Sequence, residues 1–234
     1  MLDTSRGDRI FDFINTTMLV LITIIVLYPL LFVLSASVSD PSAVVRGELW
    51  LLPEGLNFEG YKKVFQNSEI LTGYMNTIFY TVLGTAINLF MTICAAYPLS
   101  RKDFKGRHVV TAIIVFTMFF SGGLIPTYLL IKKLHMLNTF WALVIPNAVA
   151  VTNIIIMRTY FQSSIPYEIQ EAASIDGCNN FQILLRVVMP LSMPIIAVMI
   201  LFYAVGHWNA FFNALIYLTD RGKYPLQLIL REIL

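Results

Sequence analysis

The chain has 234 residues, of which 57% are hydrophobic and only 13% are charged, and its mean hydropathy is +0.72. A soluble domain of this length would carry about a quarter charged residues, so the composition indicates that lipid is the main solvent. The formal net charge is only +2 and no basic arm or tail accompanies it, which argues against a nucleic-acid partner.

Five uncharged apolar runs follow one another along the chain, at residues 13–39, 70–100, 109–131, 136–157 and 187–219. Each is long enough to cross a bilayer as a helix, which takes about 20 residues. Backbone groups inside hydrocarbon must be hydrogen-bonded within their own segment, so the runs predict an all-α transmembrane fold. The first run exceeds the about 7–15 apolar residues of a secretory signal, and it predicts a retained helix.

The polar segments between these runs suggest a domain organisation. We expect a cytoplasmic N-terminus at residues 1–12, a transmembrane domain at 13–219 with a cytoplasmic loop at 158–186, and an extracytoplasmic tail at 220–234. With this orientation each side of the membrane carries eight lysines and arginines, so the charge count is balanced. Residues 101–107 concentrate four cations in one short loop, which favours the cytoplasm for that loop.

The two cysteines, Cys94 and Cys178, lie in an apolar run and in a polar loop. Their spacing indicates neither a disulfide framework nor a metal site, and packing is their expected role.

The loop at residues 158–186 contains the signals of two short helices separated by a sharp turn. Pro166 suits the start of a helix, since its missing N–H would have no partner there. Gly177 predicts the stop, because glycine tolerates the left-handed conformation of a helix C-terminus. Asn179 or Asn180 can then cap a second helix that leads into the last apolar run.

One face of the first short helix combines Glu168, Glu171, Ala172 and Ile175 at helical spacing. Such a helix either lies on lipid headgroups or docks against a protein. A helix on a membrane surface usually carries lysine or arginine on its polar face, whereas this one carries only acidic charges. The small side chains of Ala172 and Ala173 would also let a partner approach the backbone closely. The pattern favours a protein partner.

The same segment carries a resemblance to a known family. Glu171-Ala172-Ala173-Ser174-Ile175-Asp176-Gly177, followed by Met189-Pro190-Leu191, resembles the EAA loop of ABC importer permeases, whose pattern is E-A-A-x-x-D-G-A and then I-x-L-P. Cys178, Val187 and Met189 depart from that pattern mildly. Residues 119–128 and 208–212 are similar to the carbohydrate (MalG-like) family and its LplC-type subgroup. The resemblance covers most of the chain and implies a type I (MetI/MalG-like) helical bundle in a heterodimeric permease for oligosaccharides.

The resemblance also implies how transport would be coupled to ATP hydrolysis. Glu171 matches the glutamate that pairs with a basic residue of the ATPase, and Gly177 matches the bend between the two short helices. The expected coupling residues are Glu171, Ala172, Ala173, Asp176, Gly177 and Pro190.

Nucleotide is expected to bind elsewhere, because the chain has no G-x-x-x-x-G-K-[ST] loop. We expect no catalytic residue, no metal ligand and no bound cofactor in this chain, with ATP and magnesium on a partner ATPase. The implied partners are a second homologous permease subunit, two copies of a cytoplasmic ABC ATPase, an extracellular solute-binding lipoprotein and membrane lipid.

Polar side chains inside the apolar runs are the candidates for a substrate pathway. They are Asn76, Asn88, Ser121, Asn147, Asn153, Trp208 and Asn209. For a single Asn or Ser the alternative role is a hydrogen bond between two helices. Trp208 beside Asn209 suits a sugar best, since an aromatic face matches a sugar ring and an amide matches its hydroxyls. His207 is expected to be a hydrogen-bonded structural group, because no second ionisable residue shares its run.

Glycines and prolines interrupt two of the runs. Gly122, Gly123 and Pro126 interrupt the third run, while Pro190 and Pro194 bend the entry to the fifth. Such positions serve either as hinges or as fixed bends, and the sequence leaves both open.

Other functions are compatible with parts of the pattern. An ABC permease for a non-sugar solute would share the EAA loop. A secondary transporter would show inverted repeats or paired intramembrane charges, and a structural or receptor-like membrane protein would have no use for the loop. Permeases of this family usually have a sixth helix, and the short apolar run at residues 226–230 cannot supply it. The sequence therefore predicts five spans in a truncated chain, or a reading frame that continues past Leu234.

Overall fold

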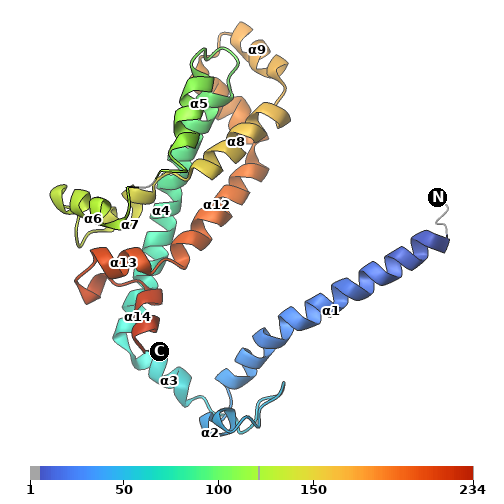
Figure 1. Ribbon diagram of the computed structural model, residues 1–234, viewed down its shortest axis with the longest axis vertical. Coiled ribbons are helices and arrows are strands. Elements are labelled where there is room, and N and C mark those ends of the chain that lie inside the picture. Colours follow the sequence, from blue (N-terminus) through green and yellow to red (C-terminus); the bar gives the residue numbers. More distant parts are fainter. Residues whose placement is uncertain (1–5, 121, 234) are drawn as a thin grey trace. The chain divides into compact units, whose positions relative to one another are not determined.

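The computed structural model describes residues 6–120 and 122–233, and every regular element in this part of the chain is a helix. The all-α prediction is therefore confirmed. The chain divides into two compact units, one ending at Asn67 and the other beginning at Ser68. Figure 1 labels the helices of both units.

The first unit consists mainly of α1 (Arg6–Ser37), a helix of 32 residues. Its segment Gly7–Ser37 is long and apolar enough to cross a membrane, and none of its most apolar window is buried within the protein. Lipid is the solvent that accommodates such a surface. The short helices α2 (Pro41–Val45) and α3 (Glu59–Gln66) follow, and Asp40 caps α2 by accepting a hydrogen bond from the Ser42 N–H at 2.9 Å.

The second unit is built around α4 (Ser68–Ser100), whose 33 residues span about 50 Å. The helix therefore extends beyond a hydrocarbon core of about 30 Å. Helices α8 (Val151–Ser164) and α12 (Met193–Trp208) pack against it, as Figure 1 shows. Their shared core includes Ala96 from α4, Met157 from α8 and Met199 from α12, each of which is fully buried.

The third apolar run, predicted as one span at residues 109–131, is divided in two. Helix α5 covers Arg107–Phe116 and α6 covers Leu124–Lys133. Gly123 has φ +83°, a conformation that glycine adopts without strain and that no helix contains. Pro126 lies in the first turn of α6, where its missing N–H does not interrupt a hydrogen bond. The break therefore lies at the glycines and proline that the sequence marks as an interruption of this run.

The fourth run, predicted at residues 136–157, is also broken. It comprises α7 (Phe140–Val144), the 3₁₀ turn η1 (Ile145–Asn147) and α8, and the two halves meet at 54°. Helix α8 continues to Ser164, so the polar loop predicted from residue 158 begins seven residues later, at Ile165. Phe161 in this extension is buried in the core that α8 shares with α4 and α12, and Arg158 donates to the Leu99 carbonyl at 3.0 Å.

The fifth run, predicted as one span at residues 187–219, is the most divided. Helix α10 (Asn180–Ile183), the π-helical turn η2 (Leu184–Val188) and α11 (Met189–Leu191) form one arm, and α12 continues from it at 83°. Pro190 and Pro194 flank the bend, and Pro194 lies in the first turn of α12, where its missing N–H interrupts no hydrogen bond. A separate helix, α13 (Phe212–Tyr217), follows α12.

By length and composition, the described residues contain two continuous helices that can cross a membrane, or four if each bent pair counts as one span. The C-terminal segment forms η3 (Arg221–Lys223) and α14 (Leu226–Ile233), and α14 packs against the first half of α4. The Leu226 N–H donates to the buried Thr77 hydroxyl at 2.8 Å. Helices α9 (Tyr167–Ile175) and α14 thus lie near opposite ends of α4 (Figure 1).

Candidate functional site: the α9 helix and a polar cavity

Helix α9 begins and ends where the sequence predicts. Pro166 is its N-cap, and at the other end the Cys178 N–H donates to the Ala173 carbonyl at 3.0 Å. This closing turn requires Gly177 at φ +84°, which a side chain would strain. Asn179 then opens α10 with a capping box, in which its side chain and that of Gln182 each bond the other's backbone N–H at 2.9 Å.

The outward face of α9 carries the predicted combination of acidic and small residues. Glu168, Glu171, Ala172 and Ile175 are all exposed, and Ile175 is exposed to 86%. Asp176 and Gly177 are exposed as well. Ala173 differs from the expectation, because it is partly buried against the core of the unit. Of the two alanines, only Ala172 is therefore exposed for close approach.

The inward face of α9 is fastened to the loop that follows α4. Gln170 is 7% exposed, and its side-chain oxygen accepts a hydrogen bond from Arg101 Nη1 at 3.0 Å. Arg101 in turn holds Asp103 through two hydrogen bonds of 2.9 Å. These bonds raise the pKa of the Arg101 guanidinium and lower the pKa of the Asp103 carboxyl, so both groups stay charged at neutral pH. This attachment was not predicted from the sequence, although the four cations at residues 101–107 were a signal for it.

The candidate coupling residue Glu171 lies at the edge of a cavity of about 500 Å³. Arg101, Asp103 and Gln170 form its wall together with Ser174 and Ile175. The motif residues and the charged loop after α4 therefore meet at one surface. Pro190, the last residue of the predicted coupling set, lies in α11 instead, next to the bend into α12.

A second cavity of about 370 Å³ lies between α4, η1, α8 and α12. It brings together the predicted pathway residues Asn88, Asn147 and Asn153 with His207. Asn88 is 2% exposed and joins three elements, because it donates to the Asn147 carbonyl at 2.8 Å while its Oδ1 lies 3.1 Å from His207 Nε2. Asn88 is 12 residues from the end of α4, which places the cavity about 18 Å along the helix from the α9 end.

Two further polar side chains line this cavity and were missed from the sequence. Asn213 belongs to α13, and it stands in the same apolar run as His207, which was the available signal. Tyr203 lines the cavity and shares a hydrogen bond of 2.6 Å with Thr92 of α4. The sequence does not distinguish a tyrosine inside the membrane from one that anchors a helix at the interface. The packing of α12 on α4 is what places Tyr203 at the cavity.

The other predicted pathway residues lie elsewhere. Asn76 donates to the carbonyls of Gly222 and Tyr224, at 2.8 and 3.1 Å, and so ties the C-terminal segment to α4. Trp208 packs edge-on against Tyr74 with ring centroids 6.4 Å apart, and Asn209 donates back to the Val205 carbonyl at 2.9 Å. Neither is among the residues that line the cavity. Ser121 lies outside the described residues.

Comparison with known proteins gives the family. The chain matches no protein-family model. It is 40% identical to the protein LplC of Bacillus subtilis over 98% of this chain and 77% of that protein. It is also 40% identical to the polygalacturonan/rhamnogalacturonan transport system permease protein YtcP of Bacillus subtilis, over 97% of this chain and 79% of the relative.

A solved structure gives the same result. A chain in the crystal structure of a bacterial ABC transporter involved in the import of the acidic polysaccharide alginate matches with a TM-score of 0.90 at 39% identity. The match covers 99% of this chain and 82% of that chain. Together with the exposed EAA helix and the apolar spans, this level of similarity is decisive: the chain belongs to the carbohydrate ABC importer permeases, integral proteins of the inner membrane, within the LplC-type subgroup.

Proposed function

We propose that this chain forms one half of the translocation pathway of an ATP-driven importer and moves an oligosaccharide across the cytoplasmic membrane by alternating access. Its partners are a second homologous permease subunit, two copies of a cytoplasmic ABC ATPase and an extracellular solute-binding lipoprotein. ATP and magnesium bind to the ATPase, and this chain carries out no catalysis. The proposal rests on the family and on the geometry of α9.

The observation that carries the proposal is the attachment of α9. Its acidic face is exposed, while its inward face is held by the Arg101–Gln170 hydrogen bond at the end of α4. A helix fixed in this way moves together with the membrane helices instead of sliding on the lipid surface. In the proposed assembly, Glu171 pairs with a basic residue of the ATPase and Ala172 allows close backbone contact.

Helix α9 is connected to the polar cavity through a few consecutive elements of the chain. Gly177 and the capping box of Asn179 join α9 to α10, and the bent arm ending at Leu191 continues into α12. Helix α12 carries Tyr203 and His207, which line the polar cavity. We infer that ATP-driven closure of the ATPases rotates this arm and changes access to the cavity. The 83° bend between the arm and α12 then transmits the rotation of the arm to α12.

The chemistry of the cavity suits a sugar. Its polar lining consists of asparagine amides, a tyrosine hydroxyl and an imidazole, groups that donate and accept hydrogen bonds as sugar hydroxyls require. These buried side chains also disfavour a solute without hydroxyl groups, because such a solute would leave them without hydrogen-bond partners. Relatives are named for polygalacturonan, rhamnogalacturonan and arabinooligosaccharides, and these define the panel of substrates to test.

The position of α9 also determines the orientation that we propose. Because the ATPase is cytoplasmic, α9 and the loop at residues 101–107 face the cytoplasm. The N-terminus then lies on the same side, residues 40–67 lie outside, and the predicted extracytoplasmic tail from residue 220 lies outside too.

Two substitutions, one in α9 and one in the turn that follows it, test the coupling role. Gly177→Pro removes the conformation at φ +84°, since proline is restricted to φ near −65°, and Ala172→Trp places a bulky ring on the contact face. The matched controls are Gly177→Asn, which tolerates the left-handed conformation, and Ala172→Ser. Each variant is purified with its partners, reconstituted with the binding protein and assayed for ATP hydrolysis stimulated by the oligosaccharide panel.

We expect the proline and tryptophan variants to enter the membrane normally, but their rate of stimulated ATP hydrolysis should be at least tenfold lower. The two control variants should keep most of the stimulated rate. Ala172→Trp should also reduce the amount of ATPase that co-purifies. Normal stimulation in both disruptive variants would refute the assignment of α9 as the coupling helix.

A further inference from the structure

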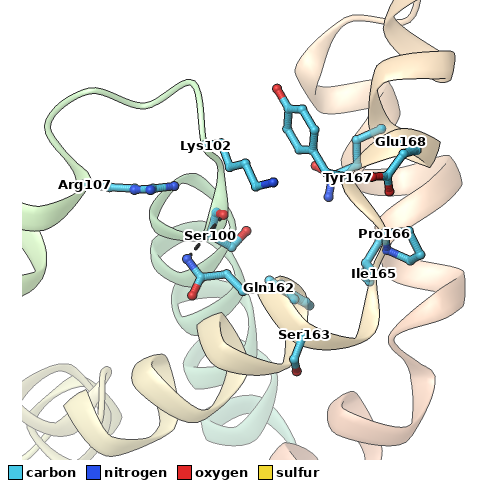
Figure 2. Close-up of a pocket in the computed structure, with 11 residues that line it drawn as sticks. Ser100, Lys102, Arg107, Gln162, Ser163, Ile165, Pro166, Tyr167 and Glu168 are labelled. Atoms are coloured by element: carbon cyan, nitrogen blue, oxygen red, sulfur yellow. Dashed lines mark hydrogen bonds between the residues drawn. The ribbon is translucent and has the colours of Figure 1, made fainter.

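A further cavity of about 380 Å³ adjoins the one at Glu171. Tyr167 and Gln170 line both, so the two cavities follow one another along the groove between α9 and the loop after α4. Figure 2 shows Lys102 and Arg107 directed into this further cavity, with the first turn of α9 on the opposite wall. We call these two residues the basic pair.

The basic pair has no carboxylate within 4 Å among the residues that the structure describes, whereas the neighbouring Arg101 has one. Lys102 Nζ lies 4.7 Å from the centre of the Tyr167 ring, a contact that positions the ammonium group and leaves its N–H donors free. Arg107 donates through Nε to His108 and through Nη1 to the Arg101 carbonyl, both at 3.2 Å. Its Nη2 group adds further donors, so the pair presents two positive charges with unused N–H groups.

The basic pair has a fixed position next to the acidic face of α9. The loop that carries Lys102 lies between α4 and α5, and Arg101 fastens it to α9 through the 3.0 Å bond to Gln170. Glu168 lines the further cavity and Glu171 the adjoining one, and three residues correspond to about 4.5 Å along a helix. A protein surface that contacts Glu171 therefore also covers the basic pair.

Covering the basic pair requires negative charge from the partner. A charge that is taken out of water without a counter-charge is strongly unfavourable, so a complementary surface has to supply one. Glu168 is the one carboxylate in the lining, and a single negative charge does not balance two cations. A second carboxylate fits, because it accepts hydrogen bonds from an ammonium and a guanidinium together.

We propose that the basic pair binds an acidic side chain of the ATPase, an inference that rests on the proposed docking of the ATPase on α9. The ATPase would then be held by two contacts of opposite polarity, a basic residue on Glu171 and an acidic residue on the basic pair. If the ATPase surface were reversed along the groove, like charges would face each other at both contacts. The pattern therefore selects one orientation of the ATPase on this subunit.

The test measures binding of the purified ATPase to the permease heterodimer in nanodiscs, with the partner permease unchanged. Lys102→Gln/Arg107→Gln removes both cations, while Lys102→Arg/Arg107→Lys keeps them. Lys102→Gln alone is matched by Lys105→Gln, because Lys105 belongs to the same loop but lines neither cavity. Ala172→Trp reports separately whether the ATPase docks on α9.

We expect loss of both cations to weaken ATPase binding about tenfold or more, since hydrogen bonds between charged groups are the strong ones at an interface. Lys102→Gln should account for part of this loss. The charge-conserving variant and Lys105→Gln should bind as the parent does. A carbodiimide, which joins an amine directly to a carboxylate, should cross-link Lys102 but not Lys105 to an aspartate or glutamate of the ATPase.

Three results would overturn the proposal. The first is equal binding of the ATPase by the parent and by the variant without the basic pair, while Ala172→Trp still weakens binding. The second is cross-linking of Lys102 to Glu168 of its own chain and to no residue of the ATPase. The third is a loss of binding that occurs only in nanodiscs containing phosphatidylglycerol, which would identify an anionic lipid as the occupant. Unchanged binding in Ala172→Trp would instead refute the docking on α9 itself, so the two failures are distinguishable.

Discussion

Replacing Gly84 by alanine places a methyl group where the His207 imidazole now lies. A Cβ built on Gly84 would be 2.6 Å from Nε2, 2.7 Å from Cε1 and 3.0 Å from Cδ2 of His207, whereas ordinary contacts begin near 3.4 Å. The ring must therefore move by most of an ångström. It then loses the 3.1 Å contact with Asn88 Oδ1, which joins α12 to α4. The change thus separates two packed helices at the polar cavity that Asn88 and His207 line.

The expected cost follows from two unfavourable effects and one favourable effect. Overpacking a tight contact costs about 1–3 kcal/mol, and a hydrogen bond between membrane helices contributes about 0.6–1.7 kcal/mol. Alanine is better than glycine inside a helix by about 1 kcal/mol, which offsets part of this. We expect Gly84→Ala to lower the free energy of unfolding by about 1–3 kcal/mol. In a chain that already carries His207→Ala, the clash is absent and the same substitution should cost nothing.

A double-mutant cycle measures this difference. The four chains are unfolded in mixed micelles with increasing SDS, and tryptophan fluorescence reports the free energy of unfolding. Gly206→Ala is the stability control, because a Cβ there meets no atom within 4 Å. We expect a coupling energy of at least 1 kcal/mol between Gly84 and His207. If the two substitutions change the free energy of unfolding additively, the position of the His207 ring does not require a glycine at residue 84. Our explanation of this contact would then be wrong.

Two further predictions concern the orientation in the membrane and the attachment of α14 to α4. In a background without the native cysteines, Asn57→Cys should react with an impermeant thiol reagent in intact cells stripped of any outer barrier, and Ser174→Cys should react only after lysis; the reverse pattern would invert the proposed orientation. Thr77→Val should destabilise the protein by about 1–3 kcal/mol, because the Leu226 N–H loses its acceptor in a buried site, and Thr77→Ser should not. Equal thermal unfolding of the two variants would contradict that account of how α14 is held.

The segment from Pro166 to Asn179 was predictable because its signals are local. Pro166, Gly177 and Asn179 define the start of α9, its end and the cap of α10 through backbone conformations that each residue type favours by itself. The apolar runs were equally readable, since hydrocarbon requires long uncharged helices whatever surrounds them. Two of the breaks were also marked, by Gly123 and by Pro190 with Pro194. The 54° bend was not predicted, although Pro146 lies in the 3₁₀ turn beside it.

The pathway residues show the same division. Sequence identified the intramembrane amides as a class, and Asn88, Asn147 and Asn153 do line one cavity. It did not separate them from Asn76, which instead holds the C-terminal segment through two backbone carbonyls 146 and 148 residues away. An asparagine in an apolar run looks the same in the sequence whether it lines a cavity or holds a distant segment. Only the packing of distant segments decides which groups it meets.

The amino-acid sequence by itself therefore determined the membrane environment, the helical class, the family and the boundaries of α9, because these depend on composition and on conformations within a few residues. The tertiary structure decided which face of α9 is held by Arg101, which amides join at the cavity and why Gly84 must lack a side chain. Each of these depends on contacts between residues far apart in the chain. Such contacts follow from how α4, α8 and α12 pack. In lipid no hydrophobic effect drives this packing, so the apolar pattern of one helix does not show which face meets its neighbours.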